Sequence, residues 1–133
     1  MQGVGPDRLP GGTSWGADTG TAAQMGDALP YVPLGTGRTA TAVFAGPGKT
    51  CVIDNTSQIK CWGDNQNGWL GHGDVTADTS LRCLGDGAGE MGDALPVVSL
   101  GSSYTAVAVS LGLTTNCAIL NDSAGDPTRL KCW

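Results

Sequence analysis

The five cysteines are the side chains of this 133-residue sequence whose spacing most clearly suggests chemistry. Cys51 and Cys61 flank a short polar turn, and Cys117 and Cys132 flank a longer one. Residues directly opposite each other on antiparallel strands have Cα atoms about 4.5–5.5 Å apart, which a disulfide accepts. The spacing therefore predicts two hairpin disulfides, with Cys83 left over. The alternative is four reduced thiols that pack as small apolar side chains.

His72 is the only histidine of the sequence, and histidine is the side chain best suited to acid–base catalysis near neutral pH. Asp74 or Asp78 would have to orient it as a base. Neither a serine nor a cysteine stands beside it as a nucleophile, which favours an ordinary loop residue. We therefore expect no catalytic residue in this chain.

Three acidic residues in a glycine-rich stretch, Asp86, Glu90 and Asp93, raise the question of a calcium loop. Their spacing does not follow the EF-hand pattern, and glycine–aspartate pairs are common in turns. No two cysteines lie two to four residues apart, as zinc ligands usually do. The glycines match neither phosphate-loop nor dinucleotide-binding patterns. We expect neither a metal nor a cofactor.

The composition argues against two classes of partner. The formal net charge is −5, which does not attract a nucleic-acid backbone, and no apolar run has the length of a membrane span. The first residues, MQGVGPDRLPGGTSWG, lack the apolar core of a secretion signal. Location stays open between cytoplasmic and extracellular, although paired cysteines favour an oxidising compartment.

Two predicted β-hairpins position the cysteines. The β-branched and aromatic residues of KTCVID and QIKCWG fit strands, and Asn55-Thr56-Ser57 between them fits a turn. Placing Cys51 opposite Cys61 makes Val52 face Lys60 and Ile53 face Ile59. Placing Cys117 opposite Cys132 makes Ala118 face Lys131 and Ile119 face Leu130, so the two hairpins share one register. Only the loop differs, because residues 121–128 replace the shorter turn.

The whole chain repeats itself. MGDALP at 25–30 recurs at 91–96, 66 positions later, and the similarity continues through both hairpins. This self-similarity divides the chain into an irregular or eroded start at 1–24, a first repeat at 25–90 and a truncated second repeat at 91–133.

Each repeat is expected to form a blade-like unit of four antiparallel strands, and such units arranged around an axis form a β-propeller. The expected fold class is all-β, a fragment of a propeller. The predicted strands are 29–34, 39–46, 49–54 and 58–63 in the first repeat, and 95–100, 104–111, 115–120 and 129–133 in the second.

The run CWGDNQNGWLGHGD, preceded by KTCVIDNTSQIK, resembles the repeat of the regulator of chromosome condensation family, in the form common in bacterial and algal members. The resemblance covers roughly Met25 to Trp133. Trp69 stands where the family usually has glutamine, and the usual histidine before the first hairpin strand is missing. The family typically closes a ring of seven blades, so under two full repeats imply a fragment or a fold completed by association.

The resemblance implies a non-catalytic module that binds a protein partner. One alternative is a guanine-nucleotide exchange or regulatory factor for a small GTPase, and a second is a propeller-based hydrolase using His72. The expected contact loop contains Asp64, Asn65, Trp69 and His72, although Trp69 could instead pack between blades. Open sheet edges would also allow self-association.

Overall fold

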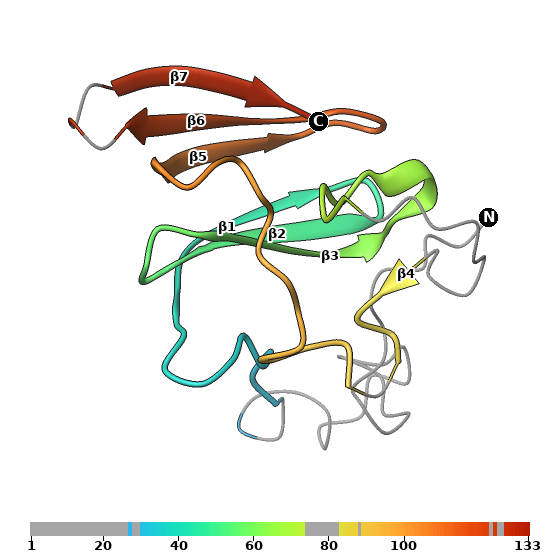
Figure 1. Cartoon of the computed structure of the whole chain (residues 1–133). Helices are drawn as coiled ribbons and strands as arrows, with labels where there is room; N and C mark the ends of the chain where they lie inside the picture. Colours follow the sequence, from blue (N-terminus) through green and yellow to red (C-terminus); the bar gives the residue numbers. More distant parts are fainter. Residues whose placement is uncertain (1–26, 28–29, 74–82, 88, 123, 125–126) are drawn as a thin grey trace.

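The computed structural model of the chain describes residues 27, 30–73, 83–87, 89–122, 124 and 127–133 (Figure 1). These residues form two antiparallel β-sheets and the short 3-10 helix η3 (Gln66–Gly68), and no α-helix occurs among them. The expectation of an all-β fold is thereby confirmed.

The first sheet has the strand order β1-β2-β3-β4. Its strands are β1 (Ala40–Gly46), β2 (Lys49–Asp54), β3 (Ile59–Asp64) and β4 (Cys83–Leu84).

The hairpin of β2 and β3 has the predicted register, with Cys51 opposite Cys61 and Ile53 opposite Ile59. Its turn is tight because a carboxylate oxygen of Asp54 accepts hydrogen bonds from the backbone N–H groups of Thr56 and Gln58, at 2.8 and 3.1 Å. Asp54 therefore ends the strand and holds the turn at the same time.

The second sheet has the order β5-β6-β7, with β5 (Tyr104–Leu111), β6 (Asn116–Asp122) and β7 (Pro127–Cys132). Cys117 pairs with Cys132, and the predicted neighbouring pairs follow in the same register. Both sheets also have a register shift at matched positions, between Ala40 and Ala42 in one and between Ala106 and Ala108 in the other.

The predicted first strands of the two repeats are wrong. Residues 30–34 contain no strand, and Leu29 lies outside the described residues. Within 95–100, only Val97 pairs, through an isolated bridge to Lys60.

Proline explains part of this difference. Pro30, Pro33 and Pro96 lack the N–H that a strand must donate. Leu34 and Leu95 are nevertheless buried, 9 % and 1 % exposed. The apolar side chains that suggested strands are therefore buried, but they hold two irregular segments in place by packing and not by strand pairing.

The strand β4 is absent from the predictions and completes the first sheet by pairing with Gly63 and Asp64. Two residues are too few to give an alternating pattern. The second unit has three strands rather than four among its described residues.

The second sheet lies over the first (Figure 1), and the two stack in a defined orientation. We call the side of each sheet that carries its cysteine pair the disulfide face, and the opposite side, with Trp62 or Trp133, the tryptophan face. The disulfide face of the first sheet packs on the tryptophan face of the second. The main core cluster contains Cys51, Ile53, Ile59 and Cys61 from the first sheet, and Val109, Ala118 and Leu120 from the second.

A smaller core cluster covers the tryptophan face of the first sheet near β3. Val52 and Trp62 pack there with Leu34, Met91 and Leu95. The segment that leads into the second repeat thus packs on this face first, then pairs with β3 at Lys60 through Val97 and continues to β5 (Figure 1).

Candidate interaction surface

Both predicted cysteine pairs are disulfides. The Cα atoms are 4.1 Å apart in Cys51–Cys61 and 4.0 Å apart in Cys117–Cys132. Cys83 lies half-buried in β4 and belongs to neither bond. Disulfides persist in oxidising environments, so the two bonds favour an oxidising compartment for this protein.

The two disulfides differ in how much solvent reaches them. Cys51 and Cys61 are 0 % exposed because the second sheet covers them. Cys117 is half-buried and Cys132 is exposed. The difference follows from the stacking, since the disulfide face of the second sheet has no sheet over it in the described part of the chain.

The residues of the expected contact loop lie between the end of β3 and the second sheet. Asp64 accepts a hydrogen bond from the N–H of Gln66 at 2.9 Å. Asn65 accepts one from the N–H of Leu70 at 3.1 Å, and Leu70 is 0 % exposed in the main core. These bonds fold the loop back onto its own strand.

Trp69 is half-buried, with its ring 5.3 Å from the ammonium nitrogen of Lys49. Its carbonyl oxygen accepts a hydrogen bond from the side-chain amide of Asn116 in β6. His72 is also half-buried. The loop therefore braces the two sheets, and contact with a partner stays a prediction for all four of its candidate residues.

Two of the three acidic residues considered for calcium, Glu90 and Asp93, accept hydrogen bonds from separate partners. Glu90 accepts hydrogen bonds from the N–H groups of Gly85 and Gly87, both at 2.8 Å. Asp93 binds Thr36, through the backbone N–H at 2.7 Å and the hydroxyl at 2.8 Å. Within the described ranges, no three His, Cys, Asp or Glu residues group as metal ligands would.

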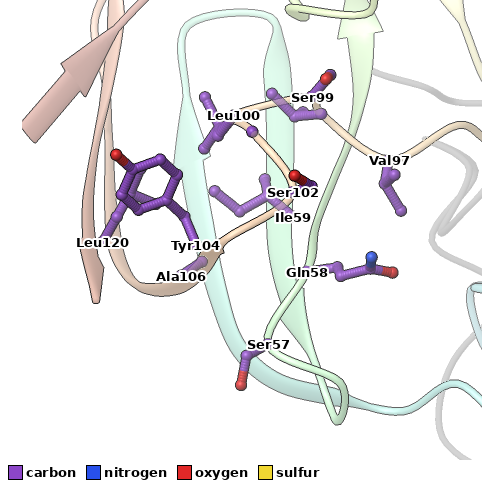
Figure 2. Close-up of a pocket in the computed structure, with 12 residues that line it drawn as sticks. Ser57, Gln58, Ile59, Val97, Ser99, Leu100, Ser102, Tyr104, Ala106 and Leu120 are labelled. Atoms are coloured by element: carbon purple, nitrogen blue, oxygen red, sulfur yellow. The ribbon is translucent and has the colours of Figure 1, made fainter. Parts of the chain in front are cut away.

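A pocket of about 250 Å³ lies where residues 97–102 cross the β2–β3 turn. Figure 2 shows Ile59 and Leu100 toward its inside, with Tyr104 and Leu120 on the side of the second sheet. The side chains that line it are apolar or carry hydroxyl and amide groups, Ser57, Gln58, Ser99 and Ser102 among them. This lining offers hydrogen bonds but no carboxylate, thiol or imidazole for catalysis.

Two lysines at matched positions hold the segments that precede the sheets. Lys60 is 4 % exposed, and its ammonium donates to the carbonyl oxygens of Leu34 at 2.7 Å and Gly92 at 2.9 Å. Lys131 donates to the carbonyl oxygen of Leu100 at 2.7 Å and lies over the ring of Tyr104 at 4.4 Å. Leu100 is the sequence counterpart of Leu34.

Burial and the nearby Arg38 lower the pKa of Lys60, against the opposing effect of Asp54 and Asp93. Sequence reasoning placed this lysine in the hairpin register but did not foresee its role. The available signal was the recurrence of Lys-Cys-Trp in both hairpins.

Among the described residues, no further sheet covers either outer face of the two-sheet stack, although Met91 and Leu95 pack on part of the first. On the tryptophan face of the first sheet, a groove of about 590 Å³ is lined by apolar and threonine side chains and by Arg38, with Val43 68 % exposed. On the disulfide face of the second sheet, Ile119 is 44 % and Leu130 is 66 % exposed. The stack therefore presents one apolar surface at each end.

Comparison with known proteins gives no family assignment: neither a protein-family model nor a curated protein matches the chain. In the described part of the chain, no helix is long and apolar enough to cross a bilayer. The candidate interaction surface thus rests on the geometry of the two faces.

Proposed function

We propose that this protein is a non-catalytic β-sheet repeat module that binds a protein partner through the open faces of its two-sheet stack. On this proposal it is part of a longer propeller of the regulator of chromosome condensation type, with repeats at 25–90 and 91–133. The observation that carries the proposal is the pair of apolar faces left open at opposite ends of the stack. Exposed apolar sheet surface of this kind is typical of interaction sites.

The chemistry of the described side chains supports binding over catalysis. The conspicuous polar groups are engaged in holding the fold: Asp54 holds a turn, Asp93 and Glu90 cap loops, and Lys60 joins two segments. The open faces offer shape and apolar area, which are the ingredients of a protein interface.

Site-specific photo-crosslinking tests this proposal. A photoreactive residue at Val43 or Leu130, which are 68 % and 66 % exposed, should capture protein when the chain is incubated in a cell extract. The matched control carries the same group at Thr114, an exposed residue in the β5–β6 turn and away from both faces. Adducts at the two faces and none at Thr114 support the proposal. No adduct at either face, or equal capture at Thr114, contradicts it.

A further inference from the structure

The tryptophan face of the second sheet is buried against the first sheet, whereas the tryptophan face of the first sheet lies at the outer end of the stack. The sequence matches itself at an offset of 66 up to the hairpin turn and again at Lys60-Cys61-Trp62 and Lys131-Cys132-Trp133, so residues of β1–β3 up to Trp62 have counterparts in the second repeat. In the second repeat, the residues packed against the first sheet include the following: Val98, Leu100, Tyr104, Ala106, Val109, Ala118 and Trp133.

The groove on the first sheet is built from the counterparts of these residues. In the same order they are Val32, Leu34, Arg38, Ala40, Val43, Val52 and Trp62, and all of them line the groove. The surface that the second sheet buries against the first thus recurs in the chain as the lining of a groove of about 590 Å³. Val32 and Val43 are exposed there, whereas Leu34, Val52 and Trp62 form its buried floor with Met91 and Leu95.

The complementary surface is also present twice. Cys51, Ile53, Ile59 and Cys61 on the first sheet are between 0 % and 4 % exposed beneath the second sheet. Their counterparts on the second sheet are Cys117, Ile119, Leu130 and Cys132, with Ile119 and Leu130 exposed as given above. No charged residue occupies these paired positions on the disulfide face, and the charged side chain that lines the groove, Arg38, is already paired with Asp54.

We propose that the groove on the first sheet receives the disulfide face of the second sheet of another copy of this chain. The proposal rests on the proposed function, because it names the partner of the same two faces. A second copy is the occupant favoured by the structure, since the chain already forms one interface between surfaces of these two kinds. The contact joins faces, in contrast to self-association through sheet edges.

Such a contact is head-to-tail, because the two surfaces that meet are different. Each copy keeps one unused groove and one unused face, so further copies add until a ring closes or a chain of molecules grows. In a complete propeller, neighbouring repeats of one polypeptide would fill both positions.

A mixing experiment with two variants tests this arrangement. Val43→Asp places a charge in the groove, and Leu130→Asp places one on the disulfide face. Sedimentation velocity of the oxidised wild-type chain should show concentration-dependent association, and each variant alone should associate at least about tenfold more weakly. Leu113→Asp is the matched control, since Leu113 is 66 % exposed but lies in the β5–β6 turn, and it should associate like wild type.

Mixing distinguishes head-to-tail contact from a symmetric one. The Val43→Asp chain keeps its disulfide face and the Leu130→Asp chain keeps its groove, so an equal mixture should form dimers of one chain of each kind and nothing larger. Absence of dimers in the mixture, or unweakened association of either variant, overturns the proposal. Wild type that stays monomeric overturns it as well.

Cross-linking within the purified protein provides a measurement that does not depend on the variants folding. A photoreactive residue at Val43 should join two copies, and the partner peptide should come from β6 or β7. If Val43 instead captures only a different protein from an extract, the self-association proposal is wrong while the proposed binding function stands. If Val43 and Leu130 capture nothing from either source, both proposals fail.

Discussion

A matched pair of positions shows how single residues adapt each sheet to its surroundings. In the first sheet, Arg38 donates to the carboxylate of Asp54 at 2.6 Å and also contacts Thr56 and Gln58. In the second sheet, the counterparts are Tyr104 and Leu120, and Leu120 is 1 % exposed in the core between the sheets. The Arg38–Asp54 ion pair therefore lies on the outer face of the first sheet. The matching apolar pair, Tyr104 and Leu120, lies on the face of the second sheet that packs against the first.

Replacing Arg38 and Asp54 by the apolar residues of the second sheet should show whether the two positions depend on each other for stability. Asp54→Leu removes the acceptor for Arg38 and for the turn, and should lower the free energy of unfolding by about 2–4 kcal/mol. Adding Arg38→Tyr should recover about 1 kcal/mol, because no unpaired guanidinium then remains. Urea unfolding of the two single variants and the double variant measures the coupling. Strictly additive losses would show that the two positions act independently.

Asp54 should also contribute to acid unfolding. Burial alone would raise its pKa, but the hydrogen bonds from Thr56 and Gln58 and the contact with Arg38 outweigh burial and lower the pKa below its usual value of 3.8. A lowered carboxylate pKa contributes stability above the unfolded-state value, and this stability is lost as the pH falls through the folded-state value.

As the pH falls below the usual aspartate value of 3.8, wild-type protein should therefore lose stability more steeply than Asp54→Asn protein. Asp93 also has a lowered pKa, but it is present in both proteins and cancels in the comparison. Urea midpoints measured across this range provide the test. Parallel curves for the two proteins would contradict the assignment.

The two matched lysines should differ in their contribution to stability. Lys60→Met leaves the carbonyls of Leu34 and Gly92 without their donor in a buried place, and should cost about 1–3 kcal/mol. Lys131→Met removes the donor to a single carbonyl and the cation over the Tyr104 ring at a half-buried position, and should cost about 1 kcal/mol. Thermal unfolding under oxidising conditions compares them. Equal costs would contradict the greater contribution expected of the buried lysine.

At the scale of elements, the cysteine pairs made the hairpins predictable. Cysteines opposite each other fix the register, and every predicted pair around them is present in the structure. The segments at 30–34 and 95–100 were not predictable in the same way. Apolar residues of both segments are buried. The sequence pattern, however, does not distinguish a strand that pairs through backbone hydrogen bonds from an irregular segment that is held by side-chain packing alone.

The contacts between elements were also beyond sequence reasoning. The side-chain amide of Asn116 reaches the carbonyl of Trp69 across 47 positions of the sequence. The ammonium of Lys49 reaches the carbonyl of Leu113, at 3.2 Å, across 64. Local patterns do not encode such pairings, because they depend on which faces of the two sheets meet.

The difference in burial between the hairpins predicts an order of reduction. Thiol–disulfide exchange requires access to a sulfur atom, so the Cys117–Cys132 bond should react first with a mild reductant. The Cys51–Cys61 bond should persist until the sheets separate, because both cysteines are 0 % exposed. Differential alkylation followed by mass spectrometry of the two hairpin peptides measures the order. Simultaneous reduction, or reversed order, would contradict the stacking.

At the scale of the whole molecule, the two sheets are stacked in one direction. The disulfide face of the first meets the tryptophan face of the second, so one surface of each kind stays open. Both proposals depend on this polarity, because a stack with two disulfide faces together would have identical ends. Such a stack would have no complementary surfaces to offer to another copy.

The polarity can be measured through Gly46 of β1, which lies directly against Leu111 of β5. A Cβ added at Gly46 would come within 2.6 Å of the Leu111 Cβ, so only glycine permits this approach. Nuclear Overhauser effects recorded on the oxidised protein in dilute solution should connect the Gly46 α protons with the Leu111 β protons. Effects that connect Gly46 or Cys51 with Leu130 would place the two disulfide faces together and contradict the account.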